Sequence, residues 1–148
     1  MDAAGNCYAV GHTYPNYIRF GSDTLSGPSS NAMFLVKYDN AGNLVWSRKA
    51  TGGTGDSKFT AIRTDASGTS YVAGYYNGGG TLTLGSTTLS PGLNPAAVVA
   101  KYDAIGNVIW ARCPGKVTTV APVTLFTADV DDSGNVYVAG SFFDGTAV

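Results

Sequence analysis

The sequence has little charge and few reactive side chains. Charged residues make up 13% of its 148 residues, and it holds one histidine and two cysteines. A net charge of −1 excludes the strongly basic surface that binds nucleic acid or an anionic membrane. Two cysteines are too few for a disulfide framework, so Cys7 and Cys113 are expected to be partly buried thiols.

Long apolar runs and catalytic spacings are also missing. No run approaches the roughly 20 apolar residues of a transmembrane helix. The opening stretch "MDAAGNCYAVG" lacks the basic and apolar segments of a signal peptide. Nucleophile-elbow, Walker, dinucleotide and zinc patterns do not occur, so the sequence predicts no catalytic residue, no cofactor and no metal centre.

Glycine, by contrast, is abundant. It supplies 20 of the 148 residues, and hydrophobic residues make up 44%. Glycine reaches the positive φ angles that tight turns need. No segment has an apolar period of 3.6, so the composition predicts a turn-rich, all-β protein without helices.

Two strings recur along the chain. "KYDNAGNLVWSR" at Lys37–Arg48 returns 64 residues later as "KYDAIGNVIWAR" at Lys101–Arg112. A second element occurs three times: "DAAGNCYAVG" at Asp2–Gly11, "DASGTSYVAG" at Asp65–Gly74 and "DDSGNVYVAG" at Asp131–Gly140. Self-similarity at such a period indicates repeated supersecondary units.

One complete period predicts four strands, A to D. They are expected at 58–64, 69–76, 96–102 and 107–113, with an extra short strand or β-turn at Thr81–Leu84. Asp-x-x-Gly turns join A to B and C to D, because the aspartate can accept bonds from the turn's own N–H groups and the glycine can adopt the left-handed conformation.

Strand C is apolar at successive positions, in both "AAVVAKY" and its copy "AMFLVKY". Such a strand is covered on both faces, whereas a strand covered on one face alternates. Four-stranded antiparallel units buried on both sides predict the blades of a β-propeller, and a two-layer β-sandwich is the alternative.

The repeat divides the chain into three parts. Residues 1–57 are a partial blade that lacks its first strand, 58–122 a complete blade, and 123–148 the first two strands of a third blade. Since propellers close with about four to eight blades, the expected partners are the remaining blades of a longer propeller or further copies of the chain.

The patterns "GNVYVAGSF", "TLTLGSTTLS" and "VAKYDAIGNVIWAR" together resemble the bacterial SBBP-type β-propeller repeats over nearly the whole chain. The stretch Cys113–Leu125 departs from the pattern. The resemblance implies a propeller in a secreted or cell-surface protein of the Bacteroidetes group, exported by the type IX route. It implies no catalytic residues, and it implies an extracellular location.

One loop suggests calcium. "DVDDSGN" places Asp129, Asp131 and Ser133 at alternate positions before a glycine, as in some calcium loops. The equivalent loop carries Arg63 at the first of these positions, and no acidic residue closes the site downstream. The alternative interpretation is an Asp-initiated hairpin turn.

Aromatic side chains that follow strand B give the candidate ligand site. Aromatic rings stack on sugar faces or anchor protein partners. The candidate residues, at the end of the blade that carries the long loops, are Tyr14, Tyr17, Tyr75 and Tyr76, with His12 and Arg19 as polar neighbours. Packing between blades is the alternative role for these rings, and it is the role expected for Trp46 and Trp110.

The sequence therefore favours a non-catalytic surface module that binds a protein or a glycan, or that acts as a structural spacer. The alternative is part of a propeller enzyme, a hydrolase or lyase, with its active site at the axial channel. Fold alone does not decide between them.

Overall fold

The protein consists of antiparallel β-strands. The computed structural model describes residues 1–13, 17–26, 32–52, 57–92, 95–114, 123–131 and 133–142, and within these ranges it contains no helix. No part of the described chain forms a helix suited to crossing a membrane. The thirteen strands are β1 (Cys7–Thr13), β2 (Tyr17–Phe20), β3 (Asp23–Ser26), β4 (Ala32–Tyr38), β5 (Leu44–Thr51), β6 (Lys58–Thr64), β7 (Ser70–Tyr76), β8 (Leu82–Leu84), β9 (Thr87–Leu89), β10 (Ala96–Tyr102), β11 (Val108–Arg112), β12 (Val123–Val130) and β13 (Val136–Phe142).

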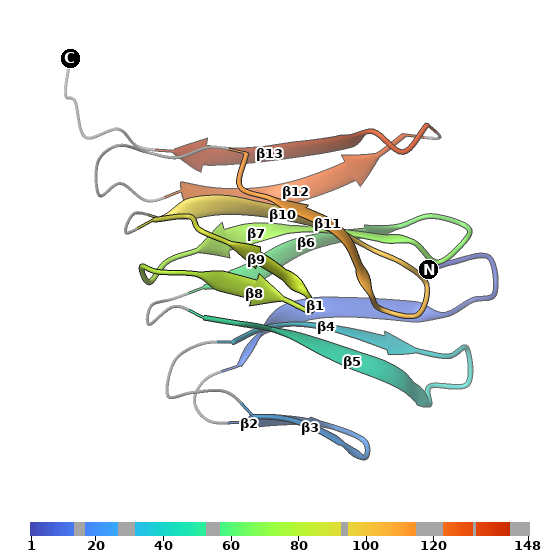
Figure 1. The fold of residues 1–148 in the computed structure, drawn as a ribbon. Coiled ribbons are helices and arrows are strands. Elements are labelled where there is room, and N and C mark those ends of the chain that lie inside the picture. Colours follow the sequence, from blue (N-terminus) through green and yellow to red (C-terminus); the bar gives the residue numbers. More distant parts are fainter. Residues whose placement is uncertain are drawn as a thin grey trace.

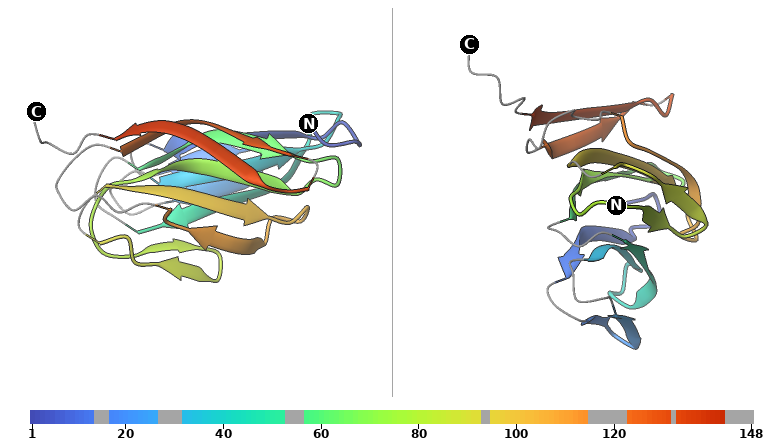
Figure 2. Two further views of the ribbon diagram at one scale, coloured as in Figure 1. Left: turned by 90° about the horizontal axis from the view of Figure 1, so that it is seen from above. Right: turned by 60° about the vertical axis from the view of Figure 1, so that its left-hand side comes forward.

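These strands form layers that stack on one another (Figures 1 and 2). The first unit contains β1, β4 and β5, together with the separate hairpin β2–β3. The second unit is a four-stranded sheet in the order β11-β10-β7-β6, and the third is the pair β12–β13. The all-β, antiparallel prediction is confirmed, and strands A to D of the second unit lie where the sequence predicts them.

Strand β10 shows why successive residues are apolar. Its residues Ala96 to Ala100 are all buried. Val98 and Ala100 enter the core shared with the first unit, whereas Ala97 and Val99 enter the core shared with the third. Because neighbouring residues of a strand point to opposite faces, each face of β10 contacts a different unit. The two-sided burial predicted for strand C is confirmed.

The core between the first and second units is the larger one. Its fully buried members include Leu35 of the first unit and Val72, Tyr76 and Leu84 of the second. Burying a side chain of this size contributes about 1.5–3 kcal/mol to folding. The core between the second and third units contains small residues, with Leu125 as its largest member among the buried ones.

A bulge occurs at the same place in two units. Between β6 and β7 the register shifts at Phe59/Ala61, opposite Gly74. Between β12 and β13 it shifts at Leu125/Thr127, opposite Gly140. A bulge inserts one extra residue and brings the two backbones close together, which favours glycine on the facing strand.

The short hairpin β8–β9 crosses from its own unit to the neighbouring one. The sequence predicts a short strand at Thr81–Leu84 but no partner for it. In the structure β8 pairs with β5 of the first unit, with Ala50 opposite Leu84 and Thr51 opposite Thr83. The buried side chains of Leu82 and Leu84 join the core there, so the hairpin extends the first sheet with residues from the second unit.

Candidate functional site

Five tight turns gather at one end of the stack (Figure 1). All share one pattern of backbone hydrogen bonds, shown by Asp103. Its backbone N–H donates to Asn107 O and its carbonyl accepts from Gly106 N, while its carboxylate accepts from the N–H groups of Ile105 and Asn107. The side chain of Asn107 donates to the second carboxylate oxygen at 3.0 Å. The five turns begin at Asp2, Asp39, Asp65, Asp103 and Asp131, and the fourth residue of each is a glycine with φ between 79° and 85°.

Hydrogen bonds hold the turn carboxylates in their ionised form. At Asp39 and Asp131 the side chains of Asn43 and Asn135 are the main cause of a lowered pKa. At Asp65 and Asp103 burial opposes ionisation, but donors in the turn outweigh it and the pKa is again lowered. The turns therefore depend on a negative charge at each aspartate.

We expect acid to destabilise the protein through these turns. Each folded-state pKa lies below the ordinary value of about 3.9, so the stabilisation is complete above about pH 4 and is lost as the pH falls toward the folded values. Melting temperatures between pH 7 and pH 2 should fall steeply below pH 4. The variant Asp103→Asn should have a weaker pH dependence. A melting temperature that stays constant down to pH 2 would contradict this role.

The first and second units dock through one of these turns. Trp46 Nε1 donates to the carbonyl of Ala104 at 3.2 Å, and Lys37 Nζ donates to the same carbonyl at 3.3 Å. Arg48 donates to Ile105 O at 2.8 Å and to Gly106 O at 2.9 Å. Three donors of the first unit therefore bind three successive carbonyls of the second. Hydrogen bonds from charged donors are worth about 1.5–3 kcal/mol each.

A buried ion pair lies next to this contact and shares Lys37 with it. Lys37 Nζ lies 3.6 Å from the Asp2 carboxylate, and their side chains are only 10% and 5% exposed. The Tyr8 hydroxyl donates to Asp2 at 2.9 Å, and the Tyr8 ring lies 5.1 Å from Lys37 Nζ. Burial raises the pKa of Asp2, but hydrogen bonds from Asn6 and Tyr8 and the charge of Lys37 lower it well below its usual range. The charges therefore remain paired within the interface.

The interface between the second and third units is more open at this end. Tyr71 and Lys101 take the positions of Tyr8 and Lys37, and Lys101 Nζ again lies over the tyrosine ring, at 4.9 Å. A cavity of about 680 Å³ lies beside them. Its other lining residues come from the turns of both units and include Arg63, Asp65, Ser67, Asp129 and Asp131. The sequence did not predict this cavity, although the 64-residue spacing of Lys37 and Lys101 indicates equivalent positions.

The carboxylates of the calcium candidate accept hydrogen bonds from groups of the protein. Asp131 accepts from the N–H groups of Ser133 and Asn135 and from the Tyr137 hydroxyl. Asp129 accepts from Arg63 Nε at 3.1 Å and from the N–H of Val130. Both carboxylates thus face protein donors, and the described residues contain no group of three or more histidine, cysteine or acidic side chains placed to hold a metal ion.

No protein-family model matches this chain, and no curated protein does either. The resemblance to SBBP-type repeats therefore stays a prediction. The geometry of the chain's own units is the physical basis for assigning a function.

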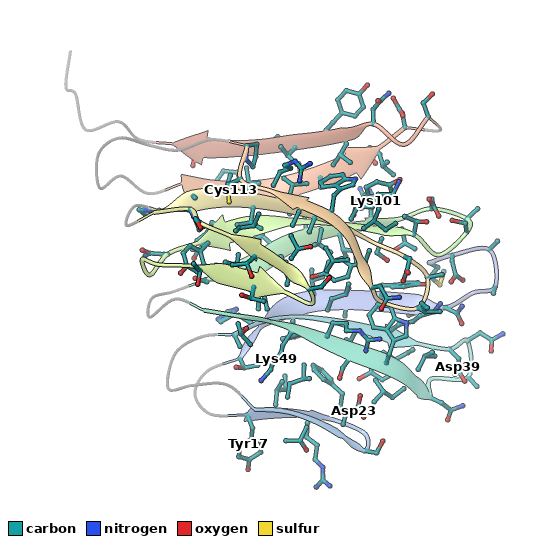
Figure 3. The ribbon with its side chains drawn as sticks, viewed as in Figure 1. Tyr17, Asp23, Asp39, Lys49, Lys101 and Cys113 are labelled. Atoms are coloured by element: carbon teal, nitrogen blue, oxygen red, sulfur yellow. The ribbon has the colours of Figure 1, made fainter. Side chains whose placement is uncertain are left out.

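The predicted ligand residues lie in several places. Tyr14 falls outside the described residues. Tyr17 (Figure 3) and Arg19 are both exposed on β2, where residues two apart share one face. His12 is exposed on β1, and among the described residues no hydrogen bond or ring contact joins its side chain to Tyr17 or Arg19.

The two tyrosines at the end of β7 have different surroundings. Tyr75 is half-buried, and Lys58 Nζ lies 5.3 Å from its ring centre. Tyr76 is 0% exposed, and its hydroxyl donates to the carbonyl of Gly79 at 2.6 Å and lies 3.2 Å from that of Thr81. The prediction of a ligand-binding role is corrected for Tyr76: burial in the core keeps its ring away from any ligand.

Neither Cys7 nor Cys113 forms a disulfide. Cys113 is partly buried as expected, whereas Cys7 is exposed on β1. Trp46 is buried in the larger core, and Trp110 packs against the smaller one, so the packing role predicted for both is confirmed.

Proposed function

We propose that the chain is a non-catalytic β-propeller module of a secreted or cell-surface protein, and that it binds a protein or a glycan through an exposed hairpin. The resemblance to SBBP-type repeats supports the location and the propeller blades. The order β11-β10-β7-β6, with neighbouring units packed against both faces, supports the same interpretation.

The observation that carries the proposal is that polar groups at the turn end of the stack form hydrogen bonds within the protein. Lys37, Trp46 and Arg48 bind the turn of the next unit, and the carboxylates of the turns bind their own N–H groups. These groups build a rigid scaffold. Loops and hairpins mounted on such a scaffold are where recognition usually takes place.

The hairpin β2–β3 presents the ligand-binding surface. Tyr17 is 66% exposed, and Arg19 lies beside it on the same face of β2. The opposite face is anchored, since Phe20 packs on Phe34 with ring centres 4.9 Å apart and Asp23 accepts from the Ser47 hydroxyl. An aromatic ring next to a guanidinium suits stacking on a sugar or an aromatic side chain, together with hydrogen bonds to its polar groups.

The cavity between the second and third units is the observation that favours an enzyme instead. It gathers the carboxylates of Asp65, Asp129 and Asp131. Each carboxylate, however, accepts hydrogen bonds from its own turn or from Arg63. These contacts stabilise the ionised form and the fold of the turn, and they support a structural role for the three aspartates.

Arrays of immobilised glycans and extracellular proteins test the proposal. The double change Tyr17→Ala and Arg19→Ala should reduce binding at least tenfold and leave the melting temperature nearly unchanged, since exposed substitutions usually alter stability by less than about 0.5 kcal/mol. The matched control is Thr81→Ala with Thr83→Ala, at the same positions of the hairpin β8–β9. Binding that survives the first pair would refute the hairpin site. Turnover of a substrate that Asp131→Asn abolishes would favour the enzyme.

A further inference from the structure

The contact between the first and second units has a second, incomplete copy within the same chain. In the complete one, Lys37, Trp46 and Arg48 donate to the turn that joins β10 to β11. The equivalent donors of the second unit, each 64 residues later, are Lys101, Trp110 and Arg112. Within the described residues none of these three donates to a carbonyl of the third unit.

Two donors of the second set, Lys101 and Arg112, have the same pose as Lys37 and Arg48. Arg48 Nη1 donates to the carbonyl of the preceding residue, Ser47, at 2.8 Å, and Arg112 Nη1 donates to that of Ala111 at the same distance. The ammonium groups of Lys37 and Lys101 lie over equivalent tyrosine rings, at 5.1 and 4.9 Å. Donors held in this way lose little conformational freedom when an acceptor arrives.

Strand β13 of the third unit, which corresponds to β7, has one edge without a partner strand among the described residues. In the second unit β7 pairs with β6 on one side and with β10 on the other, whereas within the part of the chain that the structure describes β13 pairs only with β12. The faces of β13 are also less covered than those of β7, since Tyr137 and Val138 lie on opposite faces of the strand. Tyr71 is 2% exposed and Val72 is fully buried, but their equivalents Tyr137 and Val138 are 60% and 37% exposed. An open edge of this kind accepts a further strand.

We propose that this surface, formed by the edge of β13 with Lys101, Trp110 and Arg112, binds a β-hairpin of the same type as β4–β5 and β10–β11. The first strand of the hairpin pairs antiparallel with β13. Its Asp-x-x-Gly-Asn turn reaches the three donors, as the turn at Asp103 reaches Lys37, Trp46 and Arg48. The surface is separate from Tyr17 and Arg19, so its failure would leave the ligand proposal standing.

The occupant is a separate hairpin and not one already folded in a second copy. In this chain β4 is paired with β1 over seven positions, from Cys7 opposite Tyr38 to Thr13 opposite Ala32. β10 is paired with β7 over seven positions as well. A second copy could offer either hairpin only by breaking such a ladder, whereas a hairpin that brings no strand B of its own pairs with β13 directly.

The turn sequence restricts which hairpins fit. Gly106 lies against the Arg48 guanidinium and the Trp46 ring, and a Cβ there would lie 2.9 Å from Arg48 Nε. Its φ of 85° adds a second requirement for glycine. We therefore expect recognition to depend on the glycine of the incoming turn.

An extended chain tests the proposal. Residues 96–114 are repeated after Phe142 through a short Gly/Ser linker, in place of residues 143–148. Hydrogen exchange should show β13 amides protected at least 100-fold more than in the original chain, and the melting temperature should rise. A matched extension whose hairpin sequence is shuffled should give neither effect.

Variants then show whether the three donors carry the contact. Arg112→Ala should lower the melting temperature of the extended chain while changing that of the original chain little. Trp110→Phe, which also alters the packing against the smaller core, should cost more in the extended chain than in the original one. Arg48→Ala, at the interface that is already complete, should lower both melting temperatures. Changing the glycine of the added turn to valine should abolish the protection of β13.

Three results would overturn the proposal. In the first, the added hairpin leaves exchange at β13 unchanged. In the second, Arg112→Ala costs the same in both chains. In the third, light scattering shows the original chain to be a dimer that Arg112→Ala dissociates, since the surface would then belong to a second copy.

Discussion

Replacing Gly74 by alanine is expected to lower the free energy of unfolding by about 3 kcal/mol, near the upper end of the usual cost of overpacking. The glycine faces the bulge between β6 and β7. A Cβ there would overlap the carbonyl oxygen of Lys58 and lie 2.7 Å from the Cα of Phe59. Both obstacles are backbone atoms, so the sheet has to shift. Chemical denaturation measures the loss.

Gly11→Ala is the matched control, because Gly11 occupies the same place in its motif. There the nearest obstacle is the ring of Phe34, at 2.8 Å, and among the described strands β1 pairs with β4 alone. A ring at the end of a side chain can turn aside, so the cost should be less than half that of Gly74→Ala. Equal effects for the two substitutions would show that the approach of β6 is not what requires Gly74.

Tyr76→Ala should destabilise the protein by about 3–5 kcal/mol, the range for removing a buried aromatic ring. The ring belongs to the core between the first and second units and is fully buried. Its hydroxyl also bonds the carbonyls of Gly79 and Thr81, which lead into the hairpin β8–β9. Unfolding curves of the wild-type and variant chains give the difference directly.

Two further substitutions separate the parts played by the ring and the hydroxyl. Tyr76→Phe keeps the ring and removes the hydroxyl, and should cost about 1–2 kcal/mol. Tyr75→Ala, at the half-buried neighbour, should cost less than about 1 kcal/mol, with loss of the contact to Lys58. A stable Tyr76→Ala variant would mean that the ring is not part of the core.

The strands and turns could be predicted from the sequence because their causes are local. Asp103, Gly106 and Asn107 build their turn with their own atoms, and the turn at Asp39 repeats it. The unbroken apolar run of strand C likewise indicated coverage on both faces, which β10 shows.

The partner of the hairpin β8–β9 could not be predicted in this way. Alternating Leu82 and Leu84 indicate a strand with one buried face, but they do not say which edge it joins. The hairpin pairs with the edge of β5, and this pairing depends on how the two units pack against each other. The docking of Arg48 on a turn 57 and 58 residues away depends on the same packing.

The burial of Tyr76 follows from its position in the strand. Side chains alternate along a strand, so Val72, Gly74 and Tyr76 share one face of β7. Val72 lies on the core side, and the same alternation buries Tyr76 and leaves Tyr75 on the other face. The adjacent pair of tyrosines suggested one surface, whereas their positions in the strand assign them to two.

The first two units contact each other at two separate places along β5. Trp46 and Arg48 bind the turn of the second unit, and Ala50 and Thr51 pair with β8. Along the strand, Trp46 lies about 13 Å from Ala50 and Arg48 about 7 Å from it, at 3.3 Å per residue. With a single attachment, one unit could rotate relative to the other about that contact. Two attachments oppose such rotation, so a stack built from these units should resist twisting, and each unit should set the angle of the next.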